Sequence, residues 1–215
     1  EVLNENYWLE KADHRKKLMN DLLWNEKDKD YYDYNYTSKT PLVYESATNY
    51  YPLWAELATK EQAEYLKNSL IANLKAKGGI LSSSKASVEN FATSDVARQW
   101  DYPNGWAPHQ MMMWKGLMNY GYESEAQEFI YRWLWMITKN AADYNGTIPE
   151  KYDVVDCTHK VYAEYGNVGT EFAYITPSGF GWMNASYQYG LSLLEEPFKE
   201  KLDQLIDPDE LFEEK

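Results

Sequence analysis

The chain has 215 residues, which is long enough to bury a sizeable core and corresponds to one domain or part of a larger one. Its 34 acidic residues outnumber the 21 lysines and arginines, so the formal net charge is −13. Proteins that bind nucleic acid or anionic membranes carry basic residues in excess, so we expect neither as a partner. No stretch has the roughly 20 apolar residues of a membrane span, and none is expected.

Cysteine usage gives a weak indication of the compartment. Cys157 is the single cysteine, so an intrachain disulfide framework is excluded, and the chain is compatible with a reducing environment. Glycosylation sequons begin at Asn35, Asn145 and Asn184, but they would matter only in a secreted chain, and we treat them as chance matches. We expect a cytoplasmic location, with secretion as the alternative.

Apolar residues recur at helical spacing in six segments, separated by irregular ones. The first helix is expected over residues 5–23, ending near Trp24. The next segment is interrupted or begun near Pro52. The remaining helices are ended by Gly, by Asn-Gly or by acidic residues. In chain order after the first helix, the predicted ranges are 44–58, 61–74, 108–120, 126–137 and 182–194.

The segments between these helices are unusually rich in aromatic residues. Residues 25–36 contain the run DKDYYD, but a calcium loop of the EF-hand type would need Gly where Asp33 stands, so a solvated connection is favoured. Residues 80–98 are predicted to be a loop, and residues 147–178 to be irregular. The domain is expected to cover residues 1–194, followed by a charged surface tail over 195–215.

The order of helices and loops predicts an all-α fold. Alternating Val- and Ile-rich strands do not occur in number, which disfavours a parallel sheet. Paired helices joined by long aromatic loops indicate an α/α toroid or solenoid with a site at the end where the loops gather. An ordinary helical bundle is the alternative.

The loop QWDYPNGWAP, residues 99–108, suggests chemistry rather than packing. Aromatic residues make up 16% of the chain, including nine Trp and twenty Tyr, and rings in excess of the needs of a core usually line a surface. Two further loops, TIPEKYD (147–153) and AEYGNVGTEF (163–172), add carboxyl groups. Two carboxyl groups and flat apolar faces are what the cleavage of a sugar acetal requires.

Each candidate residue also has a structural interpretation. Glu150 could be an ordinary surface glutamate beside Lys151 or the cap of a turn. Asp101 could accept hydrogen bonds in an Asx turn that holds Pro103 to Gly105. Trp100, Trp106 and Trp182 could belong to the core.

Other catalytic and metal-binding motifs are missing from the sequence. His109 and His159 lack the partners of a triad or a zinc site, and no Gly-rich phosphate loop occurs. We therefore expect no cofactor and no metal.

The same loops resemble a known enzyme family. QWDYPNGWAP is similar to the second signature of the trehalases, glycoside hydrolase family 37, which runs Q-W-D-x-P-x-G-W-x-P. The segments EKYDV (150–154) and GFGWMN (179–184) resemble further family segments, and AEYGN (163–167) is closest to the fungal neutral trehalase branch. The resemblance covers roughly residues 5–192.

The resemblance implies a six-hairpin (α/α)6 toroid that hydrolyses α,α-trehalose to two glucoses with inversion. It implies that Glu150 is the general base and that Glu164 contacts the sugar. Trp100 and Trp182 would wall the pocket. The residues that would hold the loop in position are Asp101, Pro103 and Pro108.

Several segments of the family pattern are not found in this chain. The family's general acid, its first signature and its sugar-binding arginines belong to segments upstream of a helix like residues 5–23. We therefore expect this chain to supply about half of the barrel, as the C-terminal half. The expected partners are trehalose and the N-terminal half of the enzyme, without which the chain would be inactive. A non-catalytic helical module that binds sugar or a protein partner is the alternative.

Overall fold

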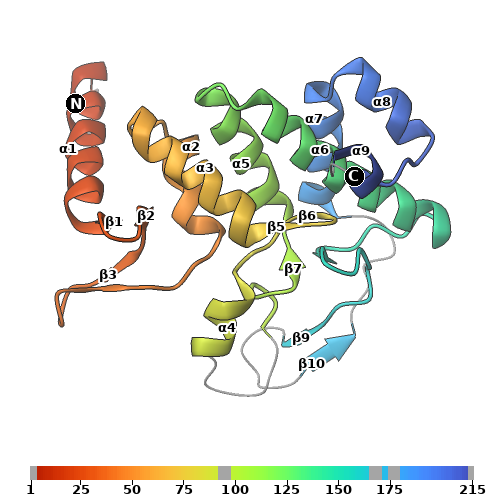
Figure 1. Ribbon diagram of the computed structural model, residues 1–215, viewed down its shortest axis with the longest axis horizontal. Coiled ribbons are helices and arrows are strands. Elements are labelled where there is room, and N and C mark those ends of the chain that lie inside the picture. The colour runs from red at the N-terminus through yellow and green to blue at the C-terminus, as the bar shows by residue number, and fades with distance from the viewer. Residues whose placement is uncertain (1–3, 92–97, 165–170, 174–179, 213–215) are drawn as a thin grey trace.

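The computed structural model describes residues 4–91, 98–164, 171–173 and 180–212, and helices make up most of it (Figure 1). One 3-10 helix, η1, covers Ala47–Tyr50. The α-helices of the described part are α1 Glu5–Leu23, α2 Tyr51–Trp54, α3 Lys60–Leu74, α4 Lys85–Phe91, α5 Ala107–Asn119, α6 Glu123–Asp143, α7 Gly181–Leu193, α8 Glu196–Asp203 and α9 Pro208–Phe212.

Strands within the described ranges form only antiparallel pairs of two or three residues a strand. The absence of an extended parallel sheet from these ranges agrees with the sequence prediction. The pairs are β1 Trp24–Asn25 with β2 Asp30–Tyr31, β3 Asp33–Asn35 with β4 Thr40–Leu42, β5 Lys75–Ala76 with β6 Gly79–Ile80, β7 Asn104–Gly105 with β8 Tyr152–Asp153, and β9 Tyr162–Glu164 with β10 Glu171–Ala173.

The core is built around α6, whose residues are buried on most of its circumference. Helix α5 packs against α6, α2 and α7. Glycine permits two of these close crossings: a Cβ on Gly116 of α5 would lie 2.9 Å from Leu53 Cβ in α2, and one on Gly190 of α7 would lie 3.0 Å from Leu134 Cδ2 in α6. Larger side chains at these two positions would force the helices apart.

Most of the predicted helices are confirmed. Helix α1 has the predicted bounds, 5–23, and α3, α5, α6 and α7 begin and end within a few residues of the predicted ranges, apart from a C-terminal extension of α6 to Asp143. Pro52 lies in the first turn of α2, where its fixed φ and missing N–H are tolerated. Thr59 and Gln62 form a capping box that starts α3.

The prediction of a loop over residues 80–98 is wrong for part of that range, because Lys85–Phe91 forms α4. The Ser84 hydroxyl accepts a hydrogen bond from the Ser87 N–H, so the last serine of the SSS run caps this helix. A short helix with a single buried residue leaves no apolar periodicity, which is why its pattern resembled a loop.

The segment expected to be a surface tail folds into α8 and α9. Leu202 is buried, and Phe198 and Phe212 pack against Tyr131 of α6. The Asp209 carboxylate accepts a hydrogen bond from Arg132, which is itself buried, at 2.8 Å. The charged side chains of this segment therefore anchor it to α6. Over the described residues, no helix is long and apolar enough to span a membrane.

Candidate functional site

Main-chain pairing brings two of the predicted loops together. Asn104 and Gly105 of the loop 99–108 pair with Asp153 and Tyr152 as strands β7 and β8. A Cβ on Gly105 would lie 2.9 Å from the Ile80 carbonyl oxygen, so only glycine permits this approach. The pairing places the QWDYPNGWAP segment beside Glu150, although about fifty residues of chain separate them. Strands β7, β9 and β10 lie on the same side of the helices in Figure 1.

Three tryptophan rings form the centre of the site. Trp100 and Trp106 are stacked, with ring centroids 3.8 Å apart and planes 7° from parallel. Trp182 meets both edge-on, at 6.4 Å from Trp100 and 5.6 Å from Trp106. Trp106 is 1% exposed whereas Trp100 is 42% exposed, so the outer ring of the stack offers a flat apolar face to solvent. The structure thus brings together Trp100 and Trp182, the two predicted wall residues.

Glu150 is buried beside this cluster, with 7% of its surface exposed. The Lys151 ammonium lies 3.0 Å from Glu150 Oε2 and 4.9 Å from the centroid of the Trp106 ring. A buried carboxylate needs such a partner, because desolvation without one would cost several kcal/mol. The interpretation of Glu150 as an ordinary surface glutamate is therefore wrong.

The loop is held in place by contacts along its length. Main-chain bonds from Asp101 N to Arg98 O and from Asn104 N to Asp101 O close the turn, which contains a cis peptide bond before Pro103. The Asp101 side chain accepts a hydrogen bond from the Tyr44 hydroxyl at 2.9 Å. Asp101 therefore ties the loop to the segment before η1, a contact between distant segments that sequence could not reveal.

The end of the loop leads directly into α5. Pro108 lies in the first turn of that helix, where its ring restricts the backbone and its missing N–H leaves no helical bond unmade. The indole Nε1 of Trp106 donates to the Gln99 carbonyl at 2.8 Å and closes the loop across its width.

His109 is a residue of this site that sequence reasoning set aside. Its imidazole lies 5.3 Å from the Trp100 ring and 6.2 Å from the Tyr51 ring, measured between centroids. Burial lowers the pKa of His109 to about 4, so the ring is neutral at neutral pH. The sequence feature that could have pointed to His109 is its position directly after Pro108, in the first turn of α5.

Several buried polar atoms around the cluster have no hydrogen-bond partner within the described part of the chain. They are His109 Nδ1, Trp182 Nε1 and Gln99 Oε1. Native proteins satisfy nearly all buried polar atoms, so a group of this kind beside an exposed ring is typical of a surface that receives water or a polar ligand.

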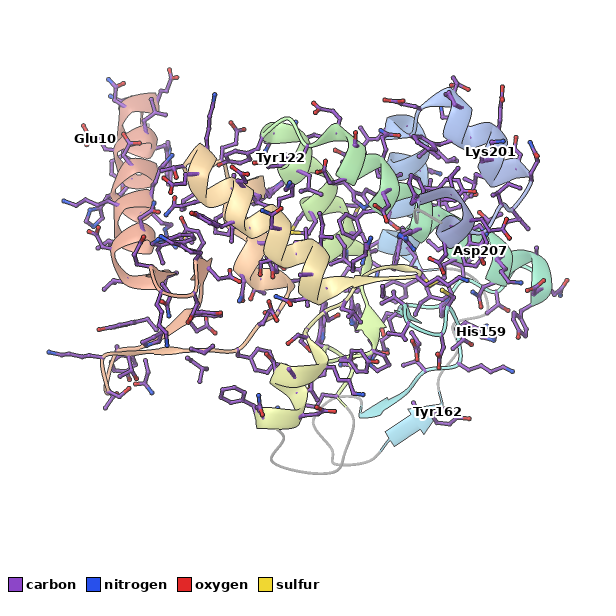
Figure 2. The ribbon with its side chains drawn as sticks, viewed as in Figure 1. Glu10, Tyr122, His159, Tyr162, Lys201 and Asp207 are labelled. Carbon is purple, nitrogen blue, oxygen red and sulfur yellow. The ribbon has the colours of Figure 1, made fainter. Side chains whose placement is uncertain are left out.

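Glu164, the predicted sugar contact, ends strand β9, where it pairs in register with Glu171 of β10. Its side chain lies outside the described residues, and so does most of the AEYGNVGTEF segment. Tyr162 of the same strand is exposed and lies away from the helices (Figure 2). Among the residues that the structure describes, no cluster of three or more His, Cys, Asp or Glu side chains could hold a metal ion.

The family model named Trehalase matches residues 1–195. The chain belongs to the trehalase family. It is 41% identical over 214 residues to a probable trehalase of Eremothecium gossypii and 43% identical over 201 residues to a cytosolic neutral trehalase of Neurospora crassa. These matches cover 99% and 92% of this chain but only 29% and 27% of the two trehalases.

Solved structures are similar to this chain over only part of their own length. Neutral trehalase Nth1 from Saccharomyces cerevisiae matches with a TM-score of 0.80 and 37% identity, over 99% of this chain and 35% of that one. A family 63 mannosylglycerate hydrolase from Thermus thermophilus matches with a TM-score of 0.57 and 17% identity over 88% of this chain, which concerns the fold alone. The predicted all-α toroid architecture is confirmed at this level, and the chain spans about a third of the trehalase structure.

Proposed function

We propose that this chain is part of an α,α-trehalase that hydrolyses trehalose with inversion, and that Glu150 is its general base. The observation that carries the proposal is the buried Glu150–Lys151 pair beside the tryptophan stack, in a chain of the trehalase family. The names of the relatives suggest the substrate, and a buried carboxylate beside flat apolar rings supports one side of the chemistry that such a substrate needs.

Inversion requires two carboxyl groups on opposite sides of the scissile bond. In the proposed reaction, Glu150 removes a proton from a water molecule as its oxygen attacks the anomeric carbon. The bond between that carbon and the bridging oxygen breaks, and a carboxylic acid protonates the departing oxygen. The resemblance puts that acid outside these 215 residues, so the remaining part of the fold is proposed to supply it.

Other residues of the site have proposed roles in binding and positioning. The exposed face of Trp100, with Trp182 at its edge, suits the apolar C–H face of a glucose ring. Glu164 is proposed to contact the sugar hydroxyls. Lys151 neutralises and positions the Glu150 carboxylate, which keeps it oriented in a site shielded from solvent.

The general-base assignment is tested by Glu150→Gln in a full-length enzyme, such as a hybrid in which this chain replaces the matching segment of a neutral trehalase. The amide keeps the shape but cannot accept the proton, so glucose release should fall by at least about a hundredfold, while a substrate analogue still binds. Glu89→Gln, on the exposed side of α4, is the matched control and should keep full activity.

The alternative is a helical module that binds sugar without catalysing its hydrolysis. Unchanged glucose release by the Glu150→Gln enzyme would exclude Glu150 as the base. It would favour the alternative for this chain, with the catalytic groups supplied by the rest of the hybrid enzyme.

A further inference from the structure

The loop that carries Trp100 is tied to two distant segments of the chain. Its own main-chain bonds close the turn, but they do not fix where the turn lies relative to the rest of the fold. The Asp101 side chain accepts a hydrogen bond from the Tyr44 hydroxyl at 2.9 Å, across 57 residues of sequence. The Tyr102 N–H donates to Ser83 Oγ at 3.0 Å. The two residues that follow Trp100 are therefore both held from outside the loop.

The segment before η1 is itself held by the serine run 82–84, which lies between that segment and the loop. Ser83 forms an antiparallel bridge with Ser46 on one side of the run. On the other side, the Ser82 N–H donates to the Asn104 carbonyl at 2.8 Å. All three serines are at most 5% exposed, and hydrogen bonds shielded from water are stronger than exposed ones. The segment is therefore a fixed base from which a side chain can hold the loop.

The Tyr44 side chain is suited to be the donor of this contact. Its ring is partly buried and meets the Phe91 ring edge-on, with centroids 5.6 Å apart. Burial raises the pKa of Tyr44, and a hydrogen bond with Ser83 opposes the rise, so the hydroxyl keeps its proton at neutral pH and donates to Asp101. Among the described ring contacts, none joins Tyr44 to the three tryptophans of the site.

We propose that Tyr44 is a positioning residue of the trehalase site, which acts through Asp101 to fix the orientation of Trp100. Trp100 directly precedes Asp101, so a shift of the Asp101 backbone moves the Trp100 ring relative to Trp106 beneath it. Glu150 is held separately, by its ion pair and by the pairing of β7 with β8. Loss of the Tyr44 bond should therefore weaken sugar binding more than the chemical step. The inference rests on the proposed function, in which Trp100 binds glucose.

Tyr44→Phe tests this role, because it removes the hydroxyl and keeps the ring. The variant is made in a hybrid with the Saccharomyces cerevisiae cytosolic neutral trehalase, to which this chain is 42% identical over 207 residues. KM for trehalose should rise by at least about threefold, while kcat stays within about twofold, which is the pattern of lost substrate binding. A loss of stability alone would lower the amount of active enzyme, and so the apparent kcat, without raising KM.

Tyr120→Phe is the matched control. The Tyr120 hydroxyl donates to the Ala58 carbonyl at 2.7 Å, so the same substitution removes a bond of the same kind between distant segments. It should leave KM unchanged.

Variants of the acceptor test whether Tyr44 acts through Asp101. Asp101→Asn keeps an acceptor oxygen and should raise KM less than Asp101→Ala does. The double variant Tyr44→Phe, Asp101→Ala should be no worse than Asp101→Ala alone, because both changes break one bond. Additive effects of the two changes on KM would overturn the proposed route through Asp101.

Hydrogen exchange on the 215-residue chain tests the contact without an assay of activity. The amides of residues 99–104 should exchange at least about threefold faster in Tyr44→Phe than in the unaltered chain, because the loop then opens locally with one tertiary bond fewer. Tyr120→Phe should leave their exchange unchanged. This measurement also decides whether Tyr44 holds the loop if the hybrid fails to fold.

The two measurements separate the proposal from the proposed function. Equal exchange of residues 99–104 in Tyr44→Phe and the unaltered chain would overturn the proposal, and so would faster exchange with an unchanged KM. An equal rise of KM in Tyr44→Phe and Tyr120→Phe would overturn it too, as an effect of stability. A folded, unaltered hybrid that releases no glucose would contradict the proposed function, and the exchange of residues 99–104 would still decide whether Tyr44 holds the loop.

Discussion

Two residues of one type have different roles in the tryptophan stack. Trp100 and Trp106 lie face to face, yet one is 42% and the other 1% exposed. Trp106 is surrounded by protein, anchors the loop through its bond to Gln99, and supports the Lys151 ammonium on its ring. Trp100 presents its outer face to solvent, and its contribution is therefore expected in binding rather than in stability.

Truncation should separate the two roles. Trp106→Ala removes a fully buried ring and should lower the free energy of unfolding by about 3 to 5 kcal/mol. Trp100→Ala should cost much less stability but raise KM for trehalose in the full-length enzyme by about fivefold or more, roughly 1 kcal/mol of binding. Urea unfolding and steady-state kinetics measure the two effects. Equal losses of unfolding free energy in Trp106→Ala and Trp100→Ala would contradict the assignment of stability to Trp106 and binding to Trp100.

At the scale of the elements, a buried polar cluster joins β2 to α3 and to the segment before η1. Ser69 donates to Asp30 Oδ2 at 3.3 Å and also lies 3.4 Å from Glu45 Oε1. Burial raises the pKa of Asp30 to about 7, with the charge of Glu45 adding to it and the bond from the Tyr31 N–H opposing it. The carboxyl group thus holds a proton in the folded protein that it would lose on unfolding.

This difference makes stability depend on pH. An unfolded aspartate titrates near pH 3.9, so between about pH 4 and pH 7 the folded state binds more protons. The contribution of Asp30 to stability is therefore complete below that window and falls as the pH rises through it, by at most about 1.4 kcal/mol per pH unit. Burial lowers the pKa of His109 and therefore acts in the opposite direction over part of this window. The contribution of Asp30 is thus measured by urea unfolding between pH 5 and pH 7 as the difference in slope between the unaltered chain and a variant without this carboxyl group.

Asp30→Asn should make the slope more positive than that of the unaltered chain, because an amide has no proton to lose in this range. Asp33→Asn, at an exposed position of β3, should leave it unchanged. An identical pH dependence in the Asp30→Asn variant and the unaltered chain would show that Asp30 is ionised throughout.

At the scale of the whole molecule, we propose that the site forms one side of a pocket. Glu150, Trp100 and Trp182 come from segments that meet through β7, β8 and the start of α7. The chain spans 29% of the Eremothecium gossypii relative, so the opposite side of the pocket is proposed to come from other parts of the enzyme.

The isolated chain is therefore expected to release no glucose from trehalose above the buffer blank, because the second carboxyl group is proposed to lie outside it. An enzymatic glucose assay on the folded chain, with its helix content checked by circular dichroism, measures this. The hybrid described above is the positive control. Robust release by the chain alone would place the general acid within these 215 residues.

Sequence by itself determined most of the helices and the family. The spacing of apolar residues in segments such as 5–23 and 61–74 is a local property that favours a helix, and both segments are helical in the structure. The motif QWDYPNGWAP identified the trehalase family before any contact was known. The short helix α4 was missed, because its cap at Ser84 stands without an apolar stripe.

Tertiary structure alone decided which side chains meet. Glu150 and Lys151 are neighbours in the chain, but their position beside Trp106 depends on the pairing of β7 with β8, whose residues are far apart in the chain. The hydrogen bond from Tyr44 to Asp101 likewise follows from where whole elements pack. Periodicity predicts that a helix has an apolar side, but only the packing of distant segments determines what that side faces.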